Sequence, residues 1–116
     1  PLVHTNHYLS PLFLAQDTFK KDLTDTFIRL NRLQRLSAAH KKPFTEETLL
    51  SFFRDHANYP DSVCSHEDPC DPAGCALCTV YAMTMDLDAR QLALTCGAPC
   101  EGAVERWTLE ARPARK

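Results

Sequence analysis

Neither sign of charge dominates this sequence of 116 residues, and that lack excludes whole classes of partner. Lys and Arg number 13 and Asp and Glu number 15, which gives a formal net charge of −2 and a pI of about 6.2. A protein that binds the phosphate backbone usually carries a basic surface, and an acidic run would indicate a solvating tail. The basic residues at the end, Arg112, Arg115 and Lys116, are typical of a frayed terminus. We therefore expect no nucleic-acid partner.

Long apolar runs are also lacking. No stretch approaches the roughly 20 apolar residues that cross a bilayer, so we expect no membrane partner. Residues 1–7 lack the charged leader and apolar block of a secretory signal, although a signal upstream or already removed would leave the same sequence. The cytoplasm is the favoured compartment. The sequence also contains no internal repeat and no low-complexity tract.

Two helices are predicted from the spacing of apolar residues and from their terminal residues. Over about 18–40, one apolar stripe recurs at helical intervals, made of Phe19, Leu23, Phe27, Leu30 and Leu33. Pro43 ends this helix. A second helix starts at the N-cap Thr45, has two glutamates in its first turn, and extends to about 56 or 57.

The rest of the chain predicts strands. Residues 1–9 read as an extended segment that Pro11 ends, and a loop follows it. Residues 79–87 and 91–95 are predicted to pair as a hairpin, and residues 103–109 are predicted to form a third strand. The whole of 1–116 is then one α+β segment: one strand, two helices and a three-strand antiparallel meander. A sheet covered on one face leaves the other bare, which fits one layer of a larger fold.

Six cysteines are many for this length, and four of them fall in a Cys-rich loop over 61–78. An even number permits disulfides, and the crowding also suits a metal or free thiols. Zinc commonly uses a Cys-x-x-Cys pair, which Cys75 and Cys78 provide. Cys64 with Cys70 or His66 would supply the other half, so the candidate ligands are Cys64, Cys70, Cys75 and Cys78. Cys96 could form a disulfide with Cys100 across the turn at 97–99. The sequence leaves zinc, disulfides and free thiols open.

Five motifs follow one another in order over residues 3–110. They are His4-Thr5-Asn6-His7-Tyr8-Leu9, the Arg-x-x-Arg-Leu helix within 25–33, the stretch 50–66 with Arg54-Asp55-His56 and Ser62-Val63-Cys64-Ser65-His66, the segment 79–86, and Gly97-Ala98-Pro99-Cys100-Glu101-Gly102. Together they resemble the acyl-coenzyme A:6-aminopenicillanic acid acyltransferases and their peptidase-like relatives. That family belongs to the cysteine N-terminal-nucleophile hydrolases, which also include the distant choloylglycine hydrolases.

The resemblance implies a four-layer αββα sandwich, of which this chain is the C-terminal part. In that family, autocleavage frees a cysteine whose own amino group serves as base, and this nucleophile lies upstream of the Thr-Asn-His segment. Pro1 offers no thiol. We therefore expect the nucleophile on an upstream chain of the same enzyme, and no activity from this chain alone. An internal cleavage at Cys75 or Cys78 is disfavoured, because too few residues follow to build the sheets.

The resemblance also assigns roles to particular residues. Asn6 would donate a hydrogen bond to the oxyanion, although an Asn can equally bend a strand end. Arg29 would stabilise the nucleophile's surroundings, with Arg32 as a competitor on the next turn. His4, His7 and Arg32 are candidate substrate-binding residues, although a structural role also explains a histidine.

The function predicted from the sequence is therefore part of a cysteine amide hydrolase or acyltransferase. It would act on a linear C–N amide bond through an acyl-enzyme, with a small amide or an acyl-coenzyme A as substrate and no dissociable organic cofactor. The alternative is a small interaction module, stapled by zinc or disulfides and centred on the Cys64–Cys78 loop.

Overall fold

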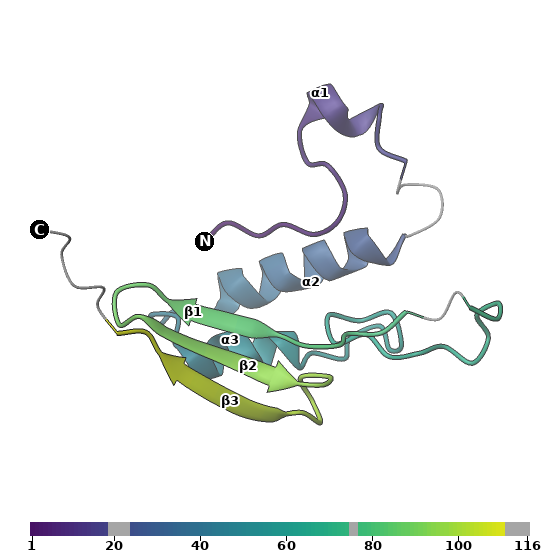
Figure 1. Cartoon of the computed structure of the whole chain (residues 1–116). Helices are drawn as coiled ribbons and strands as arrows, with labels where there is room; N and C mark the ends of the chain where they lie inside the picture. The colour runs from purple at the N-terminus through teal and green to yellow at the C-terminus, as the bar shows by residue number, and fades with distance from the viewer. Residues whose placement is uncertain (19–23, 75–76, 111–116) are drawn as a thin grey trace, which may run out of the picture.

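The fold of this chain, in a computed structural model that describes residues 1–18, 24–74 and 77–110, combines helices with one antiparallel sheet. Within these residues there are three helices and three strands (Figure 1). Their bounds are α1 (Pro11–Leu14), α2 (Asp25–Ala39), α3 (Glu46–Phe53), β1 (Met83–Asp86), β2 (Gln91–Cys96) and β3 (Ala103–Thr108). The described part of the chain is thus an α+β arrangement, as the sequence predicted.

Helix α2 ends close to where the sequence predicted. Its C-cap is His40, whose backbone N–H donates to the carbonyl of Leu36, and Pro43 follows three residues later. The helix begins at Asp25 in the described residues; Phe19 and Leu23, which were expected on its apolar stripe, lie outside them. Thr26 and Leu30 are buried. One face of α2 therefore packs inward from its first turn.

Helix α3 begins as predicted and ends earlier. Thr45 caps it, because its side-chain oxygen accepts a hydrogen bond from the backbone N–H of Thr48 at 3.2 Å. The predicted end at 56 or 57 is too late. The Asp55 carboxylate accepts the N–H of Ala57 at 3.0 Å, which replaces the helical bond that would have continued α3.

The predicted strand over residues 1–9 is wrong, and so is the loop predicted after it. Among the described residues, 1–9 belong to no strand, because their polar groups bond to α2 rather than to a neighbouring strand. Pro11 then opens the single helical turn α1, in which Ser10 accepts hydrogen bonds from the N–H groups of Phe13 and Leu14.

The three strands form a meander in the order β1-β2-β3, with β2 in the centre. The register places Met85, Leu92 and Trp107 side by side across the sheet. Strand β1 starts at Met83 rather than at residue 79. Before it, the Ala82 N–H donates to the Thr95 hydroxyl at 2.7 Å, and the Thr79 N–H donates to the Ser65 carbonyl.

Helix α3 covers one face of this sheet (Figure 1). Leu50 of α3 is fully buried and Ala93 of β2 is 1% exposed. The opposite face carries the other residues of the alternating pattern. These are Met83, Met85, Leu92, Leu94 and Trp107, of which Met85 is 58% exposed and Trp107 is 43% exposed. No described helix is both long and apolar enough to cross a bilayer.

Candidate functional site

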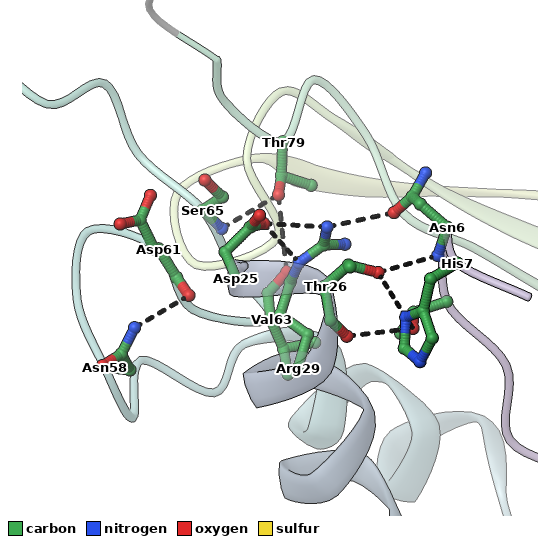
Figure 2. A network of polar contacts seen from close by, with 11 residues as sticks. Asn6, His7, Asp25, Thr26, Arg29, Asn58, Asp61, Val63, Ser65 and Thr79 are labelled. Carbon is green, nitrogen blue, oxygen red and sulfur yellow. Dashed lines mark hydrogen bonds and ion pairs between the residues drawn. The ribbon is translucent and has the colours of Figure 1, made fainter. Parts of the chain in front are cut away.

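Thr26, in the first turn of α2, holds the segment that carries Asn6. Its hydroxyl oxygen accepts the backbone N–H of Asn6 at 3.0 Å and lies 3.0 Å from His7 Nδ1, and its carbonyl accepts the Thr5 hydroxyl at 3.0 Å (Figure 2). Thr26 is fully buried. Residues 5–7 are therefore fixed to one turn of helix by hydrogen bonds that desolvation strengthens.

Asn6 and Arg29 are in direct contact although 23 residues separate them in the chain. Arg29 Nη2 donates to Asn6 Oδ1 at 3.0 Å, and Arg29 Nε donates to Asp25 Oδ2 at 2.9 Å. In Figure 2, Asn6 Nδ2 points away from Arg29. The structure thus brings together the two residues that the sequence assigned to catalysis, with Asp25 behind the arginine.

Asp61 is a further acidic group close to this pair, and it was not predicted from the sequence. Partial desolvation raises the pKa of Asp61, and the nearby charge of Asp25 raises it further. The Asp61 carbonyl accepts a hydrogen bond from Asn58 Nδ2 at 3.3 Å, and Asn58 has a positive φ of 76° (Figure 2). The guanidinium of Arg29 therefore interacts with two carboxylates, that of Asp25 directly and that of Asp61 through its charge.

The two histidines predicted to bind substrate have different surroundings. His7 is 3% exposed and stacks on Phe27 with ring centroids 3.9 Å apart, which gives it contacts of a structural kind. His4 is exposed, on the wall of an apolar hollow of about 240 Å³ that Leu33 and Phe52 also line. Substrate binding by these histidines stays a prediction.

Arg32 is engaged elsewhere. It donates two hydrogen bonds to Asp55, Nε to Oδ1 at 2.9 Å and Nη2 to Oδ2 at 2.6 Å. This bidentate contact joins α2 to the residues after α3. The Arg32 guanidinium holds the pKa of the Asp55 carboxyl below its usual range. The contact accounts for Arg32 without a substrate.

A second polar group gathers two histidines and two cysteines: His56, Cys64, His66 and Cys100. One potential ligand atom from each lies within 4.8 Å of the others. His56 Nε2 and His66 Nε2 are 3.0 Å apart, and the sulfurs of Cys64 and Cys100 are 3.5 Å apart. His66 Nε2 lies 3.7 Å from Cys64 Sγ and 3.4 Å from Cys100 Sγ. This His/Cys group could hold a metal ion.

Of the four cysteines predicted as ligands, Cys64 alone is in the His/Cys group among the described residues. Cys70 and Cys78 are exposed and outside it, and Cys75 lies outside the described residues. His66 was considered from the sequence, whereas His56 and Cys100 were missed as ligands. Nothing in the spacing of His56 and Cys100 indicates that they meet. The sequence singled them out only as members of the motifs Arg54-Asp55-His56 and 97–102.

The disulfide predicted between Cys96 and Cys100 is wrong, because the five described cysteines are all free. The Cys100 sulfur faces His66 and Cys64. The Cys96 thiol bonds to Glu105 on β3 instead, and this contact raises its pKa. Burial raises the pKa of the Cys64 thiol to about 11.

No family model matches this sequence, and no curated protein shows significant similarity to it.

Proposed function

We propose that this chain supplies the oxyanion donor and its supporting arginine to a cysteine amide hydrolase or acyltransferase. The observation that carries the proposal is the hydrogen bond from Arg29 Nη2 to Asn6 Oδ1. A guanidinium can only donate, so it selects the oxygen of the amide and turns Nδ2 outward. A side chain that would otherwise rotate freely becomes a fixed donor.

Such a donor matches the chemistry of amide cleavage. A thiolate attacks the amide carbon, the carbonyl oxygen becomes an oxyanion, and the amine leaves as the acyl-enzyme forms; water or a second amine then takes the acyl group. Asn6 Nδ2 would donate to the oxyanion in both steps. Preorganised donors of this kind contribute about 10²–10³ in rate.

In this proposal Arg29 has a positioning role. Its charge is shared with Asp25 at 2.8 Å, which offsets much of the positive field that would lower a thiol pKa. Arg29 would therefore act through Asn6, by fixing the amide, rather than by stabilising the thiolate directly.

The open face of the sheet is an argument that a partner chain exists. Met83, Met85 and Trp107 present apolar surface on the face opposite α3. In the αββα arrangement that the resemblance implies, a second sheet packs on such a face. We infer that this second sheet and the nucleophilic cysteine belong to the upstream chain of the same enzyme. The substrate class is a small linear amide or an acyl-coenzyme A.

The alternative function is an interaction module stapled around the Cys64–Cys78 loop. The His/Cys group favours metal as the staple over disulfides, but it uses Cys64 without the exposed Cys70 and Cys78. In this alternative the 13.1 kDa chain works alone.

Intact mass spectrometry of the native assembly, under native and denaturing conditions, separates the two functions. A second chain that begins with cysteine supports the enzyme. A lone species of 13.1 kDa contradicts it.

The assembly is then assayed for amine release from a panel of acyl p-nitroanilides. Asn6→Ala should lower kcat about 10²–10³-fold. Arg29→Met should lower kcat less, because the amide keeps its donor and loses only its orientation. Arg35→Met, an exposed arginine of the same helix, is the matched control. An Asn6→Ala enzyme with the parent kcat would contradict the proposal.

A further inference from the structure

We propose that His56, Cys64, His66 and Cys100 bind one zinc ion that fastens the loop after α3 to the connection between β2 and β3. The proposal concerns a structural site and does not depend on the amide-hydrolase function. Its ligand set is two thiolates and two imidazoles, a combination typical of structural zinc.

Four of the six separations between the ligand atoms are close to those of a tetrahedral site. Zn–S bonds of about 2.3 Å and Zn–N bonds of about 2.0–2.1 Å give edges of about 3.8 Å between sulfurs, about 3.3 Å between nitrogens and about 3.5 Å between sulfur and nitrogen. The corresponding distances here are 3.5 Å between the sulfurs, 3.0 Å between the nitrogens, and 3.4 and 3.7 Å from His66 to the two sulfurs. These four separations are close to those of a zinc site, and the remaining two, from His56 to the sulfurs, are no more than 4.8 Å, so His56 would have to move closer to both sulfurs to complete the tetrahedron.

The loop that carries three of the ligands is fixed by its own backbone. The Cys64 N–H donates to the Asp55 carbonyl at 3.0 Å, and the His66 N–H donates to the Pro60 carbonyl at 3.0 Å. The Ser62 hydroxyl donates to the Cys64 carbonyl at 2.5 Å. None of these hydrogen bonds uses a ligand atom. The loop is therefore positioned while the ligand atoms stay available to a metal ion.

The fourth ligand comes from the connection between β2 and β3, and this connection is equally constrained. The Gly102 N–H donates to the Ala98 carbonyl at 2.7 Å, and the Thr95 hydroxyl donates to the Gly97 carbonyl at 3.1 Å. Arg54 Nε, just after α3, donates to the Pro99 carbonyl at 2.9 Å. Cys100 is thus placed against His66 by contacts outside the His/Cys group.

A disulfide between Cys64 and Cys100 is the competing explanation for this proximity. Its sulfurs would have to close from 3.5 Å to about 2.05 Å, and it would not involve the two histidines that lie beside them. The imidazole nitrogens, 3.0 Å apart, can share a hydrogen bond, whereas a metal ion would use both rings together with both sulfurs by accepting a lone pair from each of the four atoms. Two thiolates select zinc over the harder divalent ions.

The test is metal analysis of the full chain, with any partner chain that accompanies it, purified without chelator and without a polyhistidine tag. We expect one zinc per copy of this chain. Cys64→Ser and Cys100→Ser should each lose the bound zinc. Cys70→Ser and Cys78→Ser, exposed cysteines outside the His/Cys group, are the matched controls and should retain it. Equal loss in the controls would overturn the ligand assignment.

Substitution with Co²⁺ keeps the proposal testable where a cysteine variant does not fold. The parent protein should show the visible bands of a tetrahedral cobalt site and a thiolate charge-transfer band. His56→Asn alters an exposed ligand and should change the visible bands while circular dichroism stays that of the parent. Failure of the reduced, folded protein to bind either Zn²⁺ or Co²⁺ would overturn the proposal, as would a Cys64–Cys100 disulfide in protein isolated under reducing conditions.

Discussion

Arg54 donates a hydrogen bond from Nε to the carbonyl of Pro99 at 2.9 Å, across 45 residues of chain. Pro99 is fully buried and lies next to Cys100. Glu47, at 3.6 Å from Arg54 Nη1, adds a weaker ion pair from the first turn of α3. One side chain therefore joins α3 to the connection between β2 and β3.

Replacing Arg54 by Met should loosen this connection. A hydrogen bond from a charged donor contributes about 1.5 kcal/mol, and here its loss also frees a buried carbonyl. We expect faster hydrogen exchange at residues 97–102 and weaker retention of zinc against a chelator. Arg106→Met, which breaks the exposed ion pair to Glu46, should leave exchange at 97–102 unchanged. Equal exchange in the two variants would contradict the role given to Arg54.

Gly102 should be intolerant of alanine. A Cβ at this position would stand 2.6 Å from the Cys96 carbonyl oxygen and 3.1 Å from that of Ala98, so backbone has to move. We expect Gly102→Ala to cost about 3 kcal/mol, at the upper end for overpacking. Gly74→Ala is the comparison: its φ of 83° strains an alanine by about 1–2 kcal/mol, but nothing lies within 4 Å. Denaturant unfolding should rank the two variants in this order.

Thr26 and Ser37 carry buried hydroxyls on α2, and removing the two hydroxyls should change the free energy of unfolding by different amounts. Thr26→Val removes the acceptor of the Asn6 N–H and should cost about 2 kcal/mol. It should also increase hydrogen exchange at residues 5–8. The Ser37 hydroxyl has no hydrogen-bond partner among the described residues, so Ser37→Ala should change the free energy of unfolding by less than about 0.5 kcal/mol. Similar losses in both variants would contradict the anchoring role of Thr26.

The Arg32–Asp55 pair should make stability depend on pH in the acid range. Arg32 lowers the pKa of Asp55 in the folded chain, so the unfolded chain binds more protons. The stabilisation is complete above the unfolded pKa of about 3.9 and is lost as the pH falls through the lower, folded pKa. Arg32→Gln should flatten this loss in unfolding curves taken from about pH 5 to pH 2. Arg35→Gln should keep it; a parent-like slope in Arg32→Gln would refute the assignment.

The open sheet face should matter for assembly rather than for folding. Met85 is 58% exposed in this chain, so Met85→Glu should change its unfolding free energy by less than about 0.5 kcal/mol. In the native assembly the same change would bury a charge against the partner sheet and should weaken association strongly. Native mass spectrometry measures this, with Glu110→Gln as a surface control.

The meander and the start of α3 could be predicted because their signals are local. Alternation of apolar residues around a short turn predicts β1 and β2, and the Thr45 cap predicts the start of α3. The end of α3 depends on Asp55, which is held by Arg32 from another helix. Residues 1–9 have the composition of a strand, but they bond to Thr26 instead. Such tertiary contacts leave no local pattern.

The two candidate sites were predictable to different degrees. Asn6 and Arg29 were both chosen from motifs, and the structure places them 3.0 Å apart. For the metal, spacing favoured cysteines close in sequence, such as Cys70 and Cys78. Cys100 reaches Cys64 only because the meander returns the chain, 36 residues later, to the loop after α3.

That return sets an order for building the His/Cys group during synthesis. His56, Cys64 and His66 leave the ribosome together, before any strand of the sheet, so a growing chain first carries three ligands and no fourth. Cys100 arrives only after β1 and β2 have been made. A register slip of one residue in the β1–β2 hairpin would turn its side chains to the opposite face and displace the connection that presents Cys100. In a chain with misaligned strands the proposed zinc site would lack its fourth ligand, so completion of the ligand set would depend on correct strand register.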